Sequence, residues 1–498
     1  RSRLGHATHT STLALVALTL LLAPGGFAQT GEQPMELEPE QPMELEPEFV
    51  MDPAVLQQLL TEGKTLADDN DHMDAALRFH DILQNGDEGT AVVQEAHFLL
   101  AASLYELELY QAALTWFEGV VDAGTTHPWY RRTLPYLLFI ARETGFDTNV
   151  LSRIADYPTE SYPPDYANEL HYLVGQYLYA ESNLDGAMSH LLLVQETVGD
   201  FFVRARYLEA VIHVQTSKLK EDPKNVDVEK IKKADASFKA VLRYQRDEGG
   251  SDVVDKVAAM TMLAMGRLYF STRQYNVAVR YYDKIPEDSE DWLSALFEVS
   301  WVYFQLKNYP KALGNLHALN SPYFEDQYFP ESRVLQALIL FYGCRYEQAN
   351  AVVKEFVQEY YPLMTELQQE INQFADPNAF YGWLARLSKS DQAEYSARFQ
   401  RIFNAALADR KLRRKFSFVT TLNEELVRVE RLKERHEMAR TLLEEIEGDL
   451  TAYRSLVVGE AGSLAQARLL RVLKELKQHL SAALRIKGET LKAGRGEL

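Results

Sequence analysis

The 498-residue sequence contains a single cysteine, Cys344. One cysteine cannot form an internal disulfide framework, and it excludes a cysteine-based zinc site. Folding must therefore depend on side-chain packing. We interpret Cys344 as a small, buried apolar residue on a helix, with an intermolecular disulfide as the alternative.

The signature motifs of several enzyme classes are also missing. The chain has no Gly-x-Ser-x-Gly elbow, no phosphate-binding glycine-rich loop ending in Lys-Ser/Thr, and no Cys-x-x-Cys pair. The string nearest to a metalloprotease motif begins at His436, but Arg440 replaces the second histidine that would share the metal. We interpret His97 and His171 as core histidines. The sequence predicts no enzyme, no metal site and no cofactor.

Positive charge is scarce overall, and the formal net charge is −20. So acidic a chain is a poor nucleic-acid binder. The charge is uneven, because residues 371–498 carry 23 Lys/Arg against 17 Asp/Glu, whereas residues 29–370 carry 27 against 55. This difference predicts two regions of different character. A hydrophobic content of 46% is ample for a core and argues against a disordered chain.

Only one long apolar run occurs, from Leu13 to Ala23, after Arg1 and Arg3. Pro-Gly-Gly and small residues follow it, so residues 1–28 read as a signal peptide that is cleaved after Ala28. A transmembrane anchor is the alternative. The cleavage region has no cysteine for lipid attachment, so we expect a soluble, periplasmic or otherwise exported protein and not a lipoprotein.

Residues 29–52 contain a tandem repeat, in which the eight residues from Gln33 to Glu40 recur from Gln41 to Glu48. Repeated proline and like charges oppose a packed core, so this segment reads as an acidic disordered tether. A neutral spacer and a docking motif are both consistent with it.

Residues 53–362 alternate amphipathic segments with short breaks, which predicts helical hairpins. Alanines that follow a large apolar residue by three positions mark a repeat, with spacings of 37, 74, 91, 34 and 37 residues: Ala76, Ala113, Ala187, Ala278, Ala312 and Ala349. The gaps of 74 and 91 residues each hold two repeats, and the longer gap contains the polar insertions Ser217–Glu229 and Arg246–Asp252.

The pattern resembles the tetratricopeptide repeat (TPR) family. Its clearest copy is Met262, Met265, Gly266, Tyr269, Tyr275, Ala278, Tyr282 and Pro286, and the next is Leu296, Val299, Ser300, Tyr303, Tyr309, Ala312 and Leu316. The resemblance implies an all-α, right-handed solenoid of about eight hairpins, in which Gly175, Gly266, Ala187, Ala278 and Ala312 lie at helix crossings. Residues from Ser321 to Pro362 are similar to envelope TPR proteins of Gram-negative bacteria, including those of gliding-motility machinery.

The family's concave face is lined by the first helix of each hairpin, so aromatic residues there are candidates for a partner-binding groove. In this register they fall at the fifth, ninth and twelfth positions: Phe98, Tyr105, Tyr172, Tyr179, Phe270, Phe297, Trp301, Phe304 and Phe341. Packing between neighbouring repeats is the alternative role for these rings.

Residues 363–498 read as a C-terminal helical domain. Asp391 and Glu394 have the spacing of a capping box. Two heptad-like stripes, Leu432 to Val457 and Leu469 to Ala483, flank Gly459–Ser463, which we expect to break the helix. A long, coiled-coil-like antiparallel hairpin explains both stripes, and an intermolecular coiled coil is the alternative.

One dense basic cluster stands in this C-terminal region: Arg410, Lys411, Arg413, Arg414 and Lys415. We interpret it as an exposed solubilising turn. Docking onto an acidic partner, a phospholipid surface or the chain's own acidic repeats is the alternative.

Taken together, these features predict a non-catalytic scaffold or adaptor for protein–protein interactions in the bacterial cell envelope, with possible self-association through the C-terminal helices. We expect no nucleic-acid partner and no membrane span. The alternative is a peptidoglycan- or glycan-binding module associated with an envelope enzyme, because Glu95, Glu169 and Glu331 alternate with the groove aromatics.

Overall fold

A computed structural model describes residues 51–196, 199–218, 226–324, 327–389 and 397–496. The predicted signal peptide and all but the last two residues of the predicted tether lie outside these ranges. The described chain is all-α, with 20 α-helices and no strand beyond an isolated bridge between Lys218 and Val226. No described helix is both long and apolar enough to cross a membrane. The predicted fold class is confirmed.

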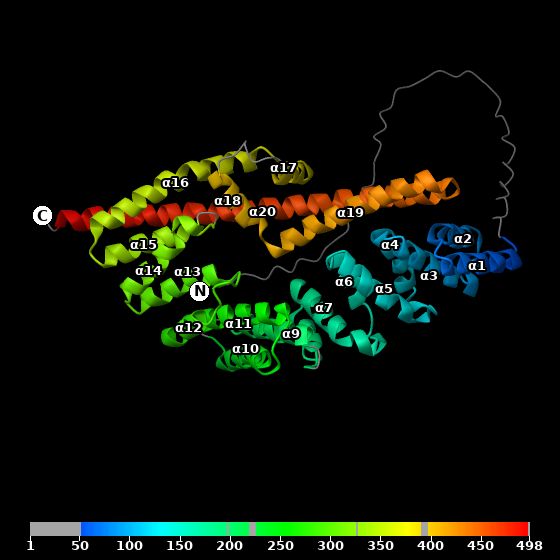
Figure 1. The fold of residues 1–498 in the computed structure, drawn as a ribbon, viewed down its shortest axis with the longest axis horizontal. Helices are drawn as coiled ribbons and strands as arrows, with labels where there is room; N and C mark the ends of the chain where they lie inside the picture. Colours follow the sequence, from blue (N-terminus) through cyan, green and yellow to red (C-terminus); the bar gives the residue numbers. More distant parts are fainter. Residues whose placement is uncertain (1–50, 197–198, 219–225, 325–326, 390–396, 497–498) are drawn as a thin grey trace, which may run out of the picture. The chain divides into compact units, whose positions relative to one another are not determined.

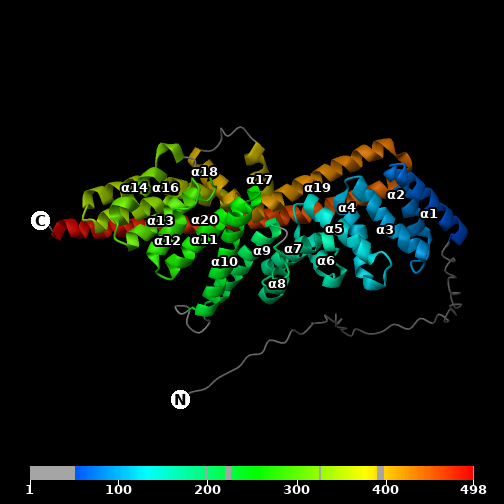
Figure 2. The same cartoon turned by 60° about the horizontal axis from the view of Figure 1, so that its bottom comes forward.

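The first sixteen helices form eight consecutive hairpins, as Figures 1 and 2 show. We call the first helix of each hairpin A and the second B. In order, the A and B helices are α1 (Pro53–Asp68) and α2 (His72–Asn85), α3 (Ala91–Glu106) and α4 (Tyr110–Asp122), α5 (Tyr130–Glu143) and α6 (Thr148–Ala155), α7 (Ala167–Ala180) and α8 (Leu184–Leu191), α9 (Gly199–Thr216) and α10 (Val228–Glu248), α11 (Asp252–Ser271) and α12 (Tyr275–Tyr282), α13 (Trp292–Gln305) and α14 (Tyr309–Leu319), and α15 (Pro330–Tyr342) and α16 (Tyr346–Asn372).

The repeat register read from the sequence holds in three dimensions. All six marker alanines are fully buried. Gly175 and Gly266 are buried too, and a Cβ on Gly266 would lie 2.7 Å from the Tyr282 ring of its own hairpin. Because the A and B helices cross closely at these points, the positions admit only small residues. The predicted helix crossings are therefore confirmed.

The turns between the A and B helices share a backbone conformation that the sequence analysis did not predict. Seven of them contain a residue with positive φ, and the turn between α5 and α6 contains a second one, Phe146 with φ 62°. The first such residue in each turn has φ between 58° and 68°: Asn70, Glu108, Gly145, Ser182, Arg273, Lys307 and Cys344. In each case the next residue donates its N–H to a carbonyl five positions earlier, at 2.6 to 3.0 Å. These bonds are the six-to-one bonds of Schellman caps, which end each A helix and turn the chain into the B helix.

Cys344 is therefore not a buried residue on a helix, as we had expected. It is exposed and occupies the left-handed position in the turn between α15 and α16. Its side chain is held at the surface because the turn, and not the hydrophobic core, sets the position of its Cα atom.

Four α-helices follow the hairpins: α17 (Pro377–Lys389), α18 (Ala397–Leu407), α19 (Arg410–Arg435) and α20 (Arg440–Gly496). The predicted boundary at residue 362 falls inside α16, which runs through Pro362 without interruption. The predicted capping box at Asp391 and Glu394 lies outside the described residues.

The predicted antiparallel hairpin exists, but its turn is elsewhere. The helix does not break at Gly459–Ser463, because α20 is continuous from Arg440 to Gly496. The chain instead turns at His436 and the short 3₁₀ helix Glu437–Ala439. A Cβ on Gly462 would lie 1.9 Å from the Pro377 carbonyl oxygen, so this glycine lets α17 approach α20 instead of ending the helix.

The two helices α19 and α20 pack against helices of both early and late hairpins. Near its start, α20 contacts α4, and further along it packs on α15 and α16 (Figure 1). On α20, Leu443, Ile446, Leu450 and Val457 of the first predicted stripe are buried, and Tyr453 is half-buried. The start of that stripe lies before α20, with Leu432 on α19 and His436 in the turn, and both are half-buried. The second stripe, from Leu469 to Ala483, is buried along α20. The hydrophobic core consequently joins solenoid residues to C-terminal residues.

Candidate functional site

The predicted groove residues separate into two groups by burial. Phe98 and Tyr172, at the fifth position, are only 5% and 9% exposed. The Phe98 ring packs on Phe117, Trp129 and Tyr136. These two rings therefore belong to the core and present no surface to a partner. The other seven predicted residues are half-buried: Tyr105, Tyr179, Phe270, Phe297, Trp301, Phe304 and Phe341.

The twelfth-position aromatics share one contact. In four hairpins the ring packs on the aromatic residue that begins the B helix, with centroids 5.6 to 6.0 Å apart: Tyr105 on Tyr110, Phe270 on Tyr275, Phe304 on Tyr309 and Phe341 on Tyr346. Tyr105 and Phe304 also contact the next hairpin, through Tyr136 and Tyr342. Each such ring supports the fold on one side while part of it remains accessible, so packing and partner binding are compatible roles here.

Two of the three glutamates on which the alternative glycan-binding role rested, Glu169 and Glu95, form ion pairs with other solenoid residues. Glu169 is buried and forms two hydrogen bonds with the Arg142 guanidinium at 2.5 and 3.0 Å. Glu95 pairs with Lys64 at 2.6 Å. Their carboxylates therefore serve contacts between helices.

The predicted core histidines are close to other rings. The His97 ring lies 5.7 Å from that of Trp116, and burial lowers the pKa of His97. His171 and His190 approach within 3.3 Å through their Nδ1 atoms. Burial, followed by repulsion from His190, lowers the pKa of His171 to about 4, so this imidazole is neutral at pH 7. No group of three potential metal ligands occurs within the described ranges.

The residues of the basic cluster differ in their surroundings. Lys411, Arg413 and Arg414 are exposed, as predicted, while the side chain of Arg410 lies outside what the structure describes. Lys415 is different, because its ammonium lies 3.1 Å from Asp147 of the solenoid and 3.0 Å from Glu460 of α20. Burial alone lowers the pKa of Lys415, but the two carboxylates outweigh it and the pKa lies above its usual value.

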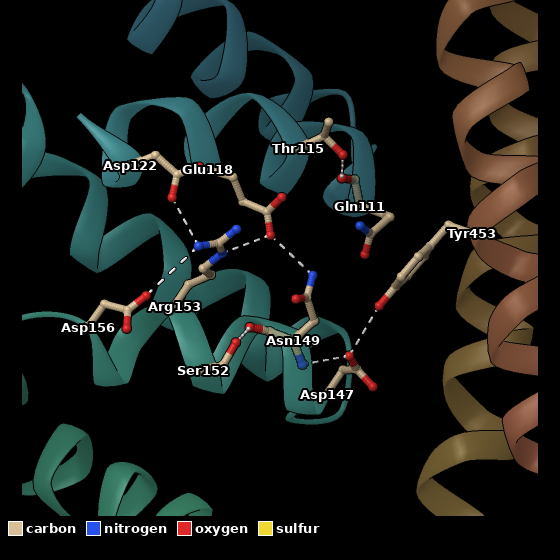
Figure 3. A network of polar contacts seen from close by, with 10 residues as sticks. All are labelled: Gln111, Thr115, Glu118, Asp122, Asp147, Asn149, Ser152, Arg153, Asp156 and Tyr453. Atoms are coloured by element: carbon tan, nitrogen blue, oxygen red, sulfur yellow. Dashed lines mark hydrogen bonds and ion pairs between the residues drawn. The ribbon is translucent and has the colours of Figure 1, made fainter. Parts of the chain in front are cut away.

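Asp147 is the centre of this attachment. It caps the N-terminus of α6 by accepting the Asn149 N–H at 3.0 Å, and it accepts a hydrogen bond from the Tyr453 hydroxyl of α20 at 3.4 Å (Figure 3). A carboxylate at a helix N-terminus is stabilised by the unpaired N–H groups there. The sequence did not predict the contact between Asp147 and Tyr453, since the two residues are 306 positions apart.

A second acidic side chain caps the N-terminus of α4. Glu425 of α19 is fully buried, and its two oxygens accept the Gln111 N–H at 3.1 and 3.0 Å. Burial raises the pKa of Glu425 to about 8, although backbone N–H groups of α4 oppose this rise. The C-terminal hairpin thus attaches to the solenoid through the N-termini of B helices.

Residues of α4, α6 and α20 also line a cleft of about 780 Å³. Arg153 crosses the solenoid side of this cleft and pairs with Glu118 at 3.1 Å, Asp122 at 3.0 Å and Asp156 at 3.9 Å (Figure 3). Asn149 donates to Glu118 at 3.2 Å and joins the same network. The sequence did not predict this cleft.

A comparison with protein families identifies tetratricopeptide repeats in this chain. Residues 60–128 match the model of the tetratricopeptide repeat family. These residues cover α2, α3, α4 and most of α1, so the resemblance drawn from the sequence is confirmed. The chain matches no curated protein sequence at a significant level.

Three similar solved structures are a tetratricopeptide repeat protein from Parabacteroides merdae, yeast Tom70 and the TPR domain of P58(IPK). The first is 11% identical with a TM-score of 0.24, covering 61% of this chain and 93% of its own. Yeast Tom70 is 11% identical with a TM-score of 0.22 and coverages of 88% and 96%. The P58(IPK) domain is 13% identical with a TM-score of 0.19 and coverages of 88% and 99%. Scores this low carry no argument about function.

Proposed function

We propose that this chain, whose residues 60–128 match the tetratricopeptide repeat family, is a non-catalytic scaffold that holds partner proteins in the bacterial cell envelope. The observation that carries the proposal is the series of half-buried aromatics on the A helices. Tyr105, Phe270, Phe304 and Phe341 each pack on the ring that begins the B helix and keep part of their own ring accessible. Rigid aromatic anchors of this kind are typical of protein-binding hot spots.

The envelope location rests on the sequence alone. Residues 1–28 have the charged start, apolar run and small-residue cleavage site of a signal peptide. Mass spectrometry of the exported protein, with an N-terminus at Gln29, is the direct test. A mature protein that still carries residues 1–28 would contradict export by this route.

The absence of catalysis is part of the same proposal. The sequence contains none of the motifs sought, and Arg153, Glu118 and Asn149 on the solenoid side of the cleft are paired with one another. We therefore assign the surfaces of this chain to binding.

The groove is tested by replacing Tyr179, Phe270, Phe304 and Phe341 together with alanine. The expected result is loss of captured envelope proteins in a crosslinking pull-down, with helicity retained in the circular dichroism spectrum. A matched control is the pair Tyr323→Ala and Tyr361→Ala, since these rings are 85% and 58% exposed and lie outside the A-helix series.

Two outcomes would decide against the groove. If the quadruple variant loses helicity, the rings are needed for packing and the binding surface lies elsewhere. If it folds and still captures the same partners as the control, the aromatic series does not bind them.

A further inference from the structure

The cleft between α4, α6 and α20 contains an unused hydrogen-bonding group. Gln111 is 6% exposed, and its side-chain carbonyl oxygen has no hydrogen-bond partner within the described chain. In Figure 3 its amide lies on the side of α4 that faces Tyr453. A buried carbonyl without a donor costs about 1–3 kcal/mol by mutational data, so a ligand that supplies an N–H to this oxygen gains affinity there.

The charges around the cleft indicate which donor fits. Three carboxylates line it, those of Glu118, Glu445 and Asp449, against the one guanidinium of Arg153. That guanidinium is already matched by Glu118, Asp122 and Asp156. Glu445 lies 3.5 Å from His80, and Asp449 is exposed with no ion pair among the described residues. The α20 side of the cleft therefore presents negative charge that a cation can neutralise.

An aromatic ring and a histidine complete the lining. Trp116 is half-buried between α4 and α20, and a cation over an indole face is attracted by the ring quadrupole. Burial lowers the pKa of His97 and so disfavours a competing positive charge on this imidazole. Carboxylates, a carbonyl acceptor and an indole together suit a group that donates several N–H bonds and carries positive charge.

We propose that this cleft binds a lysine or arginine side chain of a partner polypeptide. The inference rests on the proposed scaffold function and names the chemistry of the segment that the scaffold holds. Lysine and arginine offer only donors, three and five respectively, which suits the acceptors that Gln111 and Asp449 contribute to the lining. A cleft of about 780 Å³ also accommodates the backbone that carries such a side chain.

The test uses the full chain and fluorescein-labelled nonapeptides in which alanine alternates with lysine, arginine or glutamate. Fluorescence anisotropy is expected to show binding of the lysine and arginine peptides and none of the glutamate peptide. Asp449→Lys is expected to weaken binding at least about tenfold, because it replaces attraction at the cleft with repulsion.

A matched control separates the cleft from general attraction to an acidic protein. Glu489→Lys makes the same change of charge on the same helix, at an exposed position outside the cleft. It is expected to change the affinity by no more than about twofold, through screened long-range charge alone. Equal losses in the two variants would overturn the proposal.

A second variant tests the carbonyl without altering charge. Gln111→Met keeps the side-chain length and leaves the backbone N–H bonded to Glu425. It is expected to weaken peptide binding about threefold or more without lowering the melting temperature, because it removes an acceptor that has no partner in the folded chain. Unchanged affinity would contradict the role given to Gln111.

Failure of the cleft and failure of the scaffold function give different experimental results. If the basic peptides do not bind while the aromatic variant still loses its captured partners, the cleft assignment is wrong and the scaffold function stands. If neither surface binds anything, the proposed function fails with it.

Discussion

At the scale of single residues, small side chains decide where helices approach each other. Gly266 faces the ring of Tyr282, whose hydroxyl is held by Glu298 at 3.0 Å. Glu298 is in turn bonded to Arg267 at 2.5 to 3.1 Å. Because the ring is fixed at both ends, it cannot move aside for a larger residue at position 266.

Gly266→Ala is therefore expected to destabilise the fold by about 1–3 kcal/mol, since overpacking outweighs the better helix propensity of alanine. The matched control is Gly314→Ala on α14, where a Cβ would meet no atom within 4 Å. That variant is expected to stabilise by up to about 1 kcal/mol, because alanine is the better helix former. Thermal melts followed by circular dichroism compare the two, and equal shifts would contradict the crossing.

At the scale of the element, helix ends govern both the hairpins and the attachment of the C-terminal helices. Each A helix with a described A–B turn ends at a left-handed residue, and only one of the seven is a glycine. Such a residue is conformationally costly when it has a side chain, so local preference alone did not predict these positions. The A and B helices pack closely enough to hold the strained turn in place.

The N-terminus of α4 illustrates a helix end whose partner comes from elsewhere in the chain. Glu425 is 314 residues away from Gln111, whose N–H it accepts. Its pKa is raised from 4.5 to about 8 by burial, so the folded state holds a proton that the unfolded state releases between these values. The contribution of this residue to stability is present below pH 4.5 and is lost as the pH rises from 4.5 to about 8.

Glu425→Gln is expected to remove this part of the pH dependence, because glutamine keeps a carbonyl acceptor and cannot ionise. Melting temperatures of the native chain and the variant are compared at pH 5.5 and pH 8. The native chain is expected to lose more stability over this interval than the variant does. Parallel changes in both proteins would show that Glu425 does not titrate in this range.

At the scale of the whole described chain, the C-terminal hairpin ties early and late repeats together. Near its turn, His436 lies 3.3 Å from Asp74 of α2, and Arg428 pairs with Glu108 at 2.6 Å. Further along α20, Lys477 donates to Gln368 of α16 at 2.6 Å. The solenoid can therefore open only if these contacts, and the ion pairs of the half-buried Lys415, are broken.

Lys415→Glu is expected to destabilise the chain by on the order of 3 kcal/mol, because it leaves Asp147 and Glu460 facing a third carboxylate in a partly buried site. Hydrogen exchange is expected to speed up in α19 and in the α5–α6 hairpin together. The control is Lys411→Glu, the same substitution at an exposed position of α19, with little expected effect. If exchange changes only in α19, the hairpin does not support the solenoid.

The sequence by itself determined the helical hairpins and their register, because small residues recur at fixed intervals wherever two neighbouring helices cross. Ala278 and Gly266 could be placed at a crossing from their spacing, since local repetition reports contacts between adjacent helices. It determined equally that aromatics recur on the A helices, but not that Phe98 and Tyr172 are buried, because burial depends on what the next hairpin places over each ring.

Only the tertiary structure decided how the C-terminal region is used. The glycines near position 462 predicted a helix break, but Gly462 is where α17 approaches α20. Sequence alone could not distinguish these roles, because a glycine can either end a helix or let another helix come close. The attachments through Asp147 and Glu425, and the cleft beside Gln111, join residues about 300 positions apart. No spacing rule connects such residues, since their proximity arises from the folding back of α20 along the solenoid.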